Sequence, residues 1–217
     1  GLTYWSISST DETFRTCKIL GFEDVVKINF RNHDSVLVAA STLYEGGDLK
    51  KFMQGQQYRE AWATPVKVPI VFLDTLYGGL KVFKEGGGKQ THSLKLRAPN
   101  GTVYTLRSIS KDPEPLIPEV ANILGLENII VDGVSAQHPY AAIVVADLAK
   151  KAEVLSTRPS IVFVPEQKVL DTLNKKYGNR LYLIEYETEG SATWTGIKNT
   201  VEILDTEALQ EFKLENT

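Results

Sequence analysis

The residues best suited to binding chemistry form a glycine-rich run with polar residues behind it: Gly86, Gly87, Gly88, Lys89, Gln90 and Thr91. Glycine lets backbone N–H groups approach a phosphate closely, because no side chain intervenes. The lysine would add positive charge, and the two polar residues after it would add hydrogen-bond donors. The run matches neither the G-x-x-x-x-G-K-[ST] loop nor the G-x-G-x-x-G loop of common nucleotide-binding folds. It therefore indicates either a phosphate-binding loop or the tip of an ordinary hairpin. We call residues 86–91 the glycine tip.

The elements that must position the glycine tip are three predicted strands, at 80–83, 92–97 and 102–109. Apolar and polar residues alternate in the second and third of them, as in strands with one buried face. Asn100-Gly101 between these two strands is typical of a type I′ turn, which needs positive φ at both central residues. We therefore predict a three-stranded antiparallel meander that carries the glycine tip at one end.

The order strand, glycine loop, strand, strand is similar to the upper lobe of protein-kinase-like folds. There the loop covers ATP, and a cation on the third strand meets the phosphates. Here that cation would be Arg107, with Lys111 as the less favoured choice, although kinases use Lys and the two cations are not equivalent. Glu119 follows on a predicted helix and could pair with Arg107, but a solvated linker face is the preferred interpretation. The sequences H-R-D-x-x-x-x-N and D-F-G are not found in the 217 residues. The chain is therefore expected to be inactive alone.

Other chemistry has less support in the sequence. His138 stands before Pro139 and a predicted helix, so it is either a general base or, as we prefer, a structural cap. The three histidines form no metal-ligand spacing, and the one cysteine, Cys17, excludes a multi-cysteine site, so no structural metal is expected. Cys17 itself is expected to be a buried, inert thiol. No Ser-His-Asp set can be assembled from the spacing, and no catalytic residue is assigned.

Composition excludes two partner classes. The 217 residues carry a net charge of -3 and have a pI of about 5.7. Phosphate backbones are held by clustered Lys and Arg, so nucleic acid is not an expected partner. No run approaches the ~18 consecutive apolar residues of a membrane helix, so direct membrane insertion of this segment is not expected either.

The remaining patterns predict an α+β fold, with an antiparallel sheet around the meander at about 80–109 and helices packed on one side. Three parts are predicted: an N-terminal β arm with strands (1–40), a glycine-loop subdomain (41–112) and a helix-rich α+β part (113–217) behind a proline-rich linker. Within them we expect strands at 25–30, 35–40, 161–164 and 180–187. We also expect helices from Asp48, at 118–124, at 140–152 and at 165–177. The first is expected to have Leu49, Phe52 and Met53 on its apolar face and Lys50 and Arg59 on a solvated face. The last is expected to turn Leu170 and Tyr177 inward, and Asp132-Gly133 to form a turn. The apolar residues of the 140–152 helix surround its whole circumference, which predicts deep packing. A further helix starts near Thr206 without a closing signal, which suggests a C-terminal truncation.

Four segments carry a family resemblance: YREAWATPVKVPIVFLDTLYGGL, GGGKQTHSLKLRAPNGTVYTLRSISKDP, SAQHPYAAIVVADLAKKAEV and VFVPEQ. They resemble an uncharacterised family of large exported bacterial proteins. In that family the region is similar to the start of a protein-kinase-like module, often found with a calcineurin-like metallophosphoesterase and a surface-antigen-type outer-membrane barrel. Asp132-Gly133-Val134 departs from the Asp-Gln-Ile expected there.

The resemblance implies nucleotide-loop roles for Gly86–Gln90, the cation role for Arg107, and Mg²⁺-ATP as cofactor. It also implies a cell-envelope location, periplasmic or at the outer membrane. The partner would be the rest of the protein's own chain.

Two functions follow as expectations. The first is the N-terminal lobe of a kinase-like module that binds phosphate or nucleotide. The second is a non-catalytic periplasmic or surface module that binds protein or glycan through an aromatic groove, lined by Trp62, Tyr77, Tyr140 and Trp194.

Overall fold

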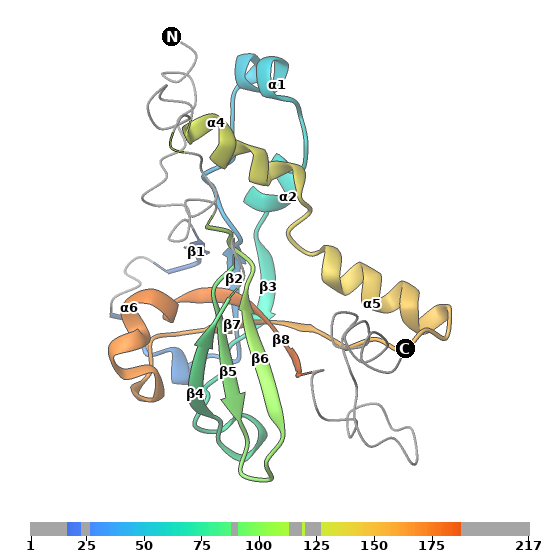
Figure 1. Ribbon diagram of the computed structural model, residues 1–217. Helices are drawn as coiled ribbons and strands as arrows, with labels where there is room; N and C mark the ends of the chain where they lie inside the picture. Colours follow the sequence, from blue (N-terminus) through green and yellow to red (C-terminus); the bar gives the residue numbers. More distant parts are fainter. Residues whose placement is uncertain (1–16, 23–26, 88–90, 113–118, 120–126, 188–217) are drawn as a thin grey trace.

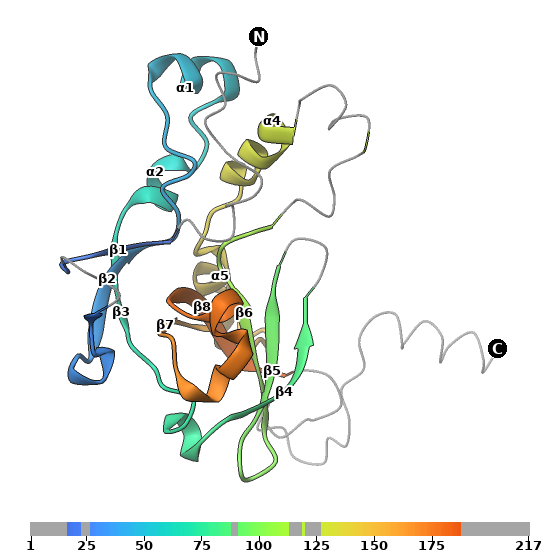
Figure 2. The same ribbon diagram turned by 90° about the vertical axis from the view of Figure 1, so that its left-hand side faces the viewer.

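The computed structural model describes residues 17–22, 27–87, 91–112, 119 and 127–187. Within them the fold is α+β with two antiparallel sheets, as the sequence predicts in class (Figures 1 and 2). The first sheet has the order β1-β2-β3 and the second the order β4-β5-β6-β8-β7. The small sheet consists of β1 (Lys18–Leu20), β2 (Ser35–Ala39) and β3 (Val66–Pro69). The expected strand at 35–40 is therefore confirmed.

The predicted meander is confirmed as β4 (Lys81–Gly86), β5 (Ser93–Arg97) and β6 (Val103–Ser108). The predicted type I′ turn between β5 and β6 is wrong, because Gly101 has a positive φ and Asn100 does not. Two strands from later in the chain complete this sheet, β7 (Ser160–Val164) and β8 (Arg180–Tyr186). β8 pairs with β6, so the strands beyond the proline-rich linker join the same sheet as the meander. A parallel bridge between Ile70 and Phe163 links the segment after β3 to β7.

Two apolar clusters lie on the two faces of β7 and β8. Phe163, Leu181 and Leu183 face the cluster shared with the small sheet, which contains Trp62 and Phe30. Val162, Tyr182 and Ile184 face the second cluster, with these meander and turn residues: Leu73, Leu80, Leu94, Leu96, Tyr104, Leu106, Leu170 and Tyr177. β7 and β8 are thus covered on both faces, whereas β5 and β6 are apolar on one face only.

The helices are short. α1 (Asp48–Gln54), α2 (Arg59–Ala63) and α4 (Glu127–Asp132) gather at one end of the molecule, and α5 (Ala141–Lys151) stands away from them (Figures 1 and 2). The expected helix at 165–177 is only partly confirmed. A 3-10 segment, Lys168–Leu173, contains Asp171 at φ 45 and ψ -120 and leads into α6 (Asn174–Tyr177). Its predicted inward residues Leu170 and Tyr177 are buried.

Three further predictions, of one strand and of the packing of two helices, are wrong. The described part of the expected 25–30 strand ends in a 3-10 turn, Phe30–Asn32, because the Asn29 side chain accepts from the Arg31 N–H and caps the turn. In α1 the two faces are exchanged: Lys50 is buried and Phe52 is 84% exposed. Lys50 is buried because it forms an ion pair with the buried carboxylate of Asp132.

The third error concerns α5, which was expected to be deeply packed. Only Ile143 of α5, with Tyr140 just before it, packs against the core, and Val144, Val145 and Leu148 are 54–60% exposed. Periodicity shows that a helix is apolar all round, but not which elements are present to cover it. Among the described residues one stretch, Ile129–Lys151, has the length and composition of a membrane span. It is broken between α4 and α5, and its residues Val131 and Val134 belong to the core, so it is weak evidence for a span.

Several expectations lie outside the described residues. These are the N-terminal arm at 2–16, the helix at 118–124, the loop with Trp194 and the helix from Thr206.

Candidate functional site

The strand register places Arg107 beside the glycine tip. Gly86 pairs with Ser93 across β4 and β5, and Ser93 pairs with Arg107 across β5 and β6. Directly opposed residues of neighbouring strands project from the same face of a sheet. The side chains of Ser93 and Arg107 therefore project from one face of the sheet. Both residues are level with Gly86, the last residue of β4. This is the arrangement that the sequence predicts for a phosphate loop with a third-strand cation.

The backbone of the glycine tip requires glycine at position 87. Gly87 has φ +143, and a Cβ there would collide with the backbone oxygen of Thr91. The described ends of the tip thus approach each other too closely for a side chain at this position. Gly88, Lys89 and Gln90 lie outside the described residues. The close approach is required by the turn itself, whether or not a ligand binds.

Arg107 belongs to a polar face that continues across β5, β6 and β8. We define the polar face as Ser93, Lys95, Thr105, Arg107, Glu185 and Glu187. Arg107 Nη2 lies 3.3 Å from Glu185 Oε1, and the Arg107 side chain is 50% exposed. Lys95 forms an ion pair with Glu187, which also accepts from Thr105 Oγ1 at 2.6 Å. The long contact and high exposure leave the guanidinium of Arg107 able to reach a second anion.

The charge of a second cation, Lys111, interacts with that of Arg107. The pKa of Lys111 is lowered by burial and by the positive charge of Arg107. Burial is the larger of the two causes, and the charge of Arg107 is the smaller. On the neighbouring residue, Asp112 Oδ2 lies 3.0 Å from His92 Nε2, and His92 directly follows the glycine tip. Lys111 stays the second choice of cation after Arg107.

Two other candidate residues have simpler local roles. Glu119 is exposed, and Arg107 pairs with Glu185 instead, in line with the preferred interpretation of Glu119 as part of a solvated face. His138 Nδ1 accepts a hydrogen bond at 3.1 Å from the backbone N–H of Tyr140, directly before α5. Its ring contacts Tyr58 and Tyr140 edge-on. The N-cap of α5 is Tyr140, and no side chain makes a cap hydrogen bond there, so His138 is neither the N-cap nor the N′ residue that the sequence predicts.

A buried charge cluster is present that the sequence did not reveal. Arg59 donates to both carboxylate oxygens of Asp132, at 2.7 and 2.5 Å, and Lys50 Nζ lies 2.9 Å from Oδ1. The side chains of Asp132 and Arg59 are each 2% exposed. Burial alone would raise the pKa of Asp132, but the hydrogen bonds from Arg59 and Lys50 outweigh it, and the pKa is lowered. We call Lys50, Arg59 and Asp132 the buried charge cluster.

The expectations for this cluster were wrong in detail. Lys50 and Arg59 were expected on a solvated helix face, and Asp132-Gly133 in a simple turn. Instead, Asp132 ends α4 and joins it to α1 and α2. Arg59 also donates to the carbonyl oxygens of Gly55 and Tyr44. Each partner lies more than 70 residues from Asp132 in sequence, so no local pattern could reveal the pairing.

The aromatic groove predicted for a binding module is also wrong. Trp62 is fully buried, and its indole N–H donates to the Gln137 carbonyl oxygen at 2.8 Å. Tyr140 packs against the same core, whereas Tyr77 lies elsewhere, stacked on Tyr104. Trp194 lies outside the described residues. A different aromatic group is partly exposed: Tyr77 and Tyr186 stack on the two sides of the buried Tyr104, with centroids 4.4 and 5.1 Å apart.

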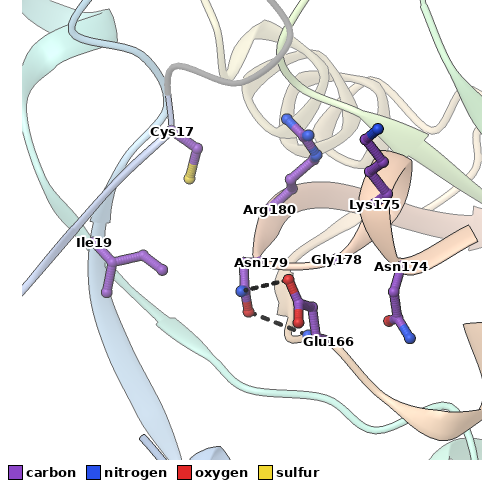
Figure 3. Close-up of a pocket in the computed structure, with 8 residues that line it drawn as sticks. All are labelled: Cys17, Ile19, Glu166, Asn174, Lys175, Gly178, Asn179 and Arg180. Atoms are coloured by element: carbon purple, nitrogen blue, oxygen red, sulfur yellow. Dashed lines mark hydrogen bonds between the residues drawn. The ribbon is translucent and has the colours of Figure 1, made fainter. Parts of the chain in front are cut away.

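Two cavities lie away from the predicted site residues. One, of about 280 Å³, opens between β1 and α6 (Figure 3) and is lined by Cys17, Ile19, Glu166, Asn174, Lys175, Gly178, Asn179 and Arg180. Burial raises the pKa of the Cys17 thiol to about 12, so the thiol stays protonated and unreactive at neutral pH. Asn179 and Glu166 hydrogen-bond each other, as Figure 3 shows. The other cavity, of about 440 Å³, lies beside Arg59 and Glu60. Neither contains an activated nucleophile among its lining residues.

No set of three or more His, Cys, Asp or Glu side chains within the described residues could hold a metal ion. Comparison with known protein families, with curated proteins and with solved structures found no match to this chain.

Proposed function

We propose that the glycine tip and Arg107 bind the phosphates of a nucleotide, as the N-terminal lobe of a kinase-like module that is inactive alone. One observation carries the proposal. The register of three strands brings a half-exposed arginine into the row that ends at Gly86, on the sheet face shared with Ser93. Backbone N–H groups of a glycine turn together with a nearby guanidinium form a recurring anion-binding arrangement.

The order of elements gives further support. The strands β4, β5 and β6 are followed by α4 and α5 and then by β7 and β8, and β8 pairs beside β6. A kinase upper lobe likewise carries its cation on the third strand and a helix after it. The chain departs from that pattern in its ion pair, because Arg107 meets Glu185 of β8 and not a helix glutamate. Mg²⁺-ATP is the proposed ligand, and a cell-envelope location and the rest of the protein's chain as partner remain part of the proposal.

The test compares two arginines by calorimetric titration with Mg²⁺-ATP. Arg97 is a matched control, because it lies on the same face of β5 as Ser93 but at the other end of the strand, over the Phe83 ring. We expect weak binding by the unaltered chain, loss of at least tenfold in affinity for Arg107→Ala, and no change for Arg97→Ala. Binding that survives Arg107→Ala, or that falls equally in both variants, contradicts the proposal.

A non-catalytic binding module is the second candidate, and the tyrosine stack favours it. Tyr77 is 50% exposed, and one face of its ring stacks on Tyr104. Its backbone is left-handed, at φ 51 and ψ 35, which is strained for a bulky residue. Flat aromatic faces with hydroxyl groups suit sugar rings. Titration with neutral hexose oligosaccharides should then shift resonances at Tyr77 and Tyr186, and Tyr77→Ala should remove the shifts; no shift excludes this candidate.

A further inference from the structure

A group of exposed cations lies where β4 pairs with β5. Lys81 pairs with Arg97, and Lys84 pairs with Lys95, which already belongs to the polar face. Directly opposed residues project from the same face of a sheet, and so do residues two apart along one strand. Lys81, Lys84 and Arg97 therefore extend the polar face to the edge of the sheet, and all three are exposed. We call these three residues the basic edge.

The three cations of the basic edge form no ion pair within the described part of the chain. The strands place two carboxylates on this side of the sheet, Glu185 and Glu187, and these pair with Arg107 and Lys95. A chain with a net charge of -3 thus carries a local excess of positive charge here. Such an excess favours a partner surface of negative charge.

The carboxylate next to Lys84 in sequence, Glu85, projects from the other face of the sheet. Glu85 pairs with Leu94, whose side chain belongs to the second apolar cluster. Its Oε2 accepts hydrogen bonds from Lys176 Nζ at 3.0 Å and from Tyr177 Oη at 3.1 Å. These two bonds lower the pKa of Glu85. Glu85 is therefore ionised and paired away from the basic edge.

An exposed aromatic ring lies beside the basic edge. The register shift between Val82 and Lys84 marks a β-bulge at Phe83, which is 45% exposed. The guanidinium carbon of Arg97 lies 4.5 Å from the centroid of the Phe83 ring, which is a cation–π contact. The ring thus orients a cation that a ligand can still reach. A ligand with carboxylates and an apolar group would contact the cations and Phe83 together.

β4 is also the open edge of its sheet. Within the described ranges no strand lies outside it, because the order of the sheet is β4-β5-β6-β8-β7 (Figures 1 and 2). The opposite end of the sheet is joined to the segment after β3, where the Val71 N–H donates to the Phe163 carbonyl oxygen at 2.9 Å. An extended peptide can lie along an open edge and bond to its backbone.

We propose that the basic edge binds an extended acidic segment of a partner protein, which lies along β4. The spacing of the cations supports this ligand. Lys81 and Arg97 form one row, and Lys84 and Lys95 form the next, two residues or about 6.6–6.8 Å away along β5. Alternate residues of an extended peptide repeat at the same distance, so carboxylates on every second residue would each meet one row. The net charge of -3 disfavours the denser charge of a nucleic acid.

Calorimetric titration of the full chain with two synthetic acidic peptides tests the proposal. The peptides have the same length and composition. One alternates glutamate with threonine, and the other groups its glutamates at one end. We expect the alternating peptide to bind at least about fivefold more tightly, because only its carboxylates project from one side at the spacing of the rows.

Two lysine variants locate the binding. Lys84→Glu reverses a charge of the basic edge, and Lys67→Glu reverses the charge of an exposed lysine within β3 of the small sheet. We expect Lys84→Glu to weaken the alternating peptide at least about tenfold and Lys67→Glu to change its affinity less than about twofold. Arg97→Ala should weaken the peptide and leave Mg²⁺-ATP binding unchanged, so this proposal and the nucleotide proposal can fail separately.

Three results overturn the proposal. Binding of neither peptide means that the lysines only protect an edge strand from unwanted pairing. Equal affinity for the two peptides, or equal losses in the two lysine variants, means that charge alone is recognised. Tighter binding of a single-stranded oligonucleotide than of the alternating peptide assigns the basic edge to nucleic acid.

Discussion

Asp132 is a single buried carboxylate shared by two buried cations, Arg59 and Lys50. Taking three charges out of water is costly, and the cost is offset only while every partner is in place. The carbonyl oxygens of Tyr44 and Gly55 use further N–H groups of Arg59 and fix its orientation. Because the cluster joins α1, α2 and α4, we assign it the role of holding these helices together.

Removing the carboxylate should destabilise the fold strongly. Asp132→Asn removes the carboxylate that pairs with Arg59 and Lys50 in the interior, so we expect a loss of about 3–5 kcal/mol in the free energy of unfolding. Urea denaturation measures it. The control is Glu60→Gln, an exposed carboxylate in the first turn of α2, with an expected loss below about 1 kcal/mol. A loss for Asp132→Asn no larger than that of the control would show that the cluster is not structurally important.

Lowering the pH should weaken the ion pairs of Asp132 with Arg59 and Lys50. The pKa of Asp132 is lower in the folded than in the unfolded chain, so its contribution is fully present above the unfolded value near 4. It is lost as the pH falls through the folded pKa, because the protonated acid no longer pairs with Arg59 and Lys50. Urea midpoints measured between about pH 6 and pH 2 should therefore fall more steeply below about pH 4 in the unaltered chain than in Asp132→Asn. Parallel curves for the two proteins would contradict this assignment.

Among the elements, strands were predicted more fully than helices. β4, β5, β6, β7 and β8 each carry a local signal, an alternating pattern, a short apolar run or the Asn100-Gly101 turn, and all five were predicted within a few residues. The pairing of β8 with β6 was not predicted, because it joins residues that are far apart in sequence, such as Tyr104 and Tyr186. For the same reason Glu185, the anion that meets Arg107, could not be predicted. The exposure of α5 was missed since sequence shows the apolar residues of a helix but not its neighbours.

The glycine tip allows a test of two glycines in the same meander. Gly101 has φ +86 with open space around a Cβ, whereas Gly87 has φ +143 and a Cβ would meet the Thr91 backbone. Alanine at Gly101 should cost about 1 kcal/mol for the backbone angle alone, and alanine at Gly87 about 2–3 kcal/mol because the strand ends must also move apart. Thermal unfolding of the two variants measures the difference. Equal losses would show that the approach of Gly87 to Thr91 is not a constraint in solution.

In the whole molecule, the two halves of the five-stranded sheet have different surroundings. β7 and β8 are covered on both faces by core residues. On the polar face Ser93 and Thr105 are buried, whereas the side chain of Arg107 is half exposed beside the glycine tip. A doubly covered half that supports an exposed cation is a suitable arrangement for a binding site. The buried charge cluster joins α1, α2 and α4 and contains no residue of the polar face, so the proposed nucleotide function rests on the polar face and the glycine tip.

The most direct test of that function is a titration of the full chain with Mg²⁺-ATP, followed by amide NMR shifts, with adenosine as the control that lacks phosphates. We predict shifts at Gly86, Gly87, Thr91 and Arg107 with Mg²⁺-ATP and none at these residues with adenosine. Shifts confined to the tyrosine stack, or no shifts with Mg²⁺-ATP at any residue, would contradict phosphate binding at the glycine tip.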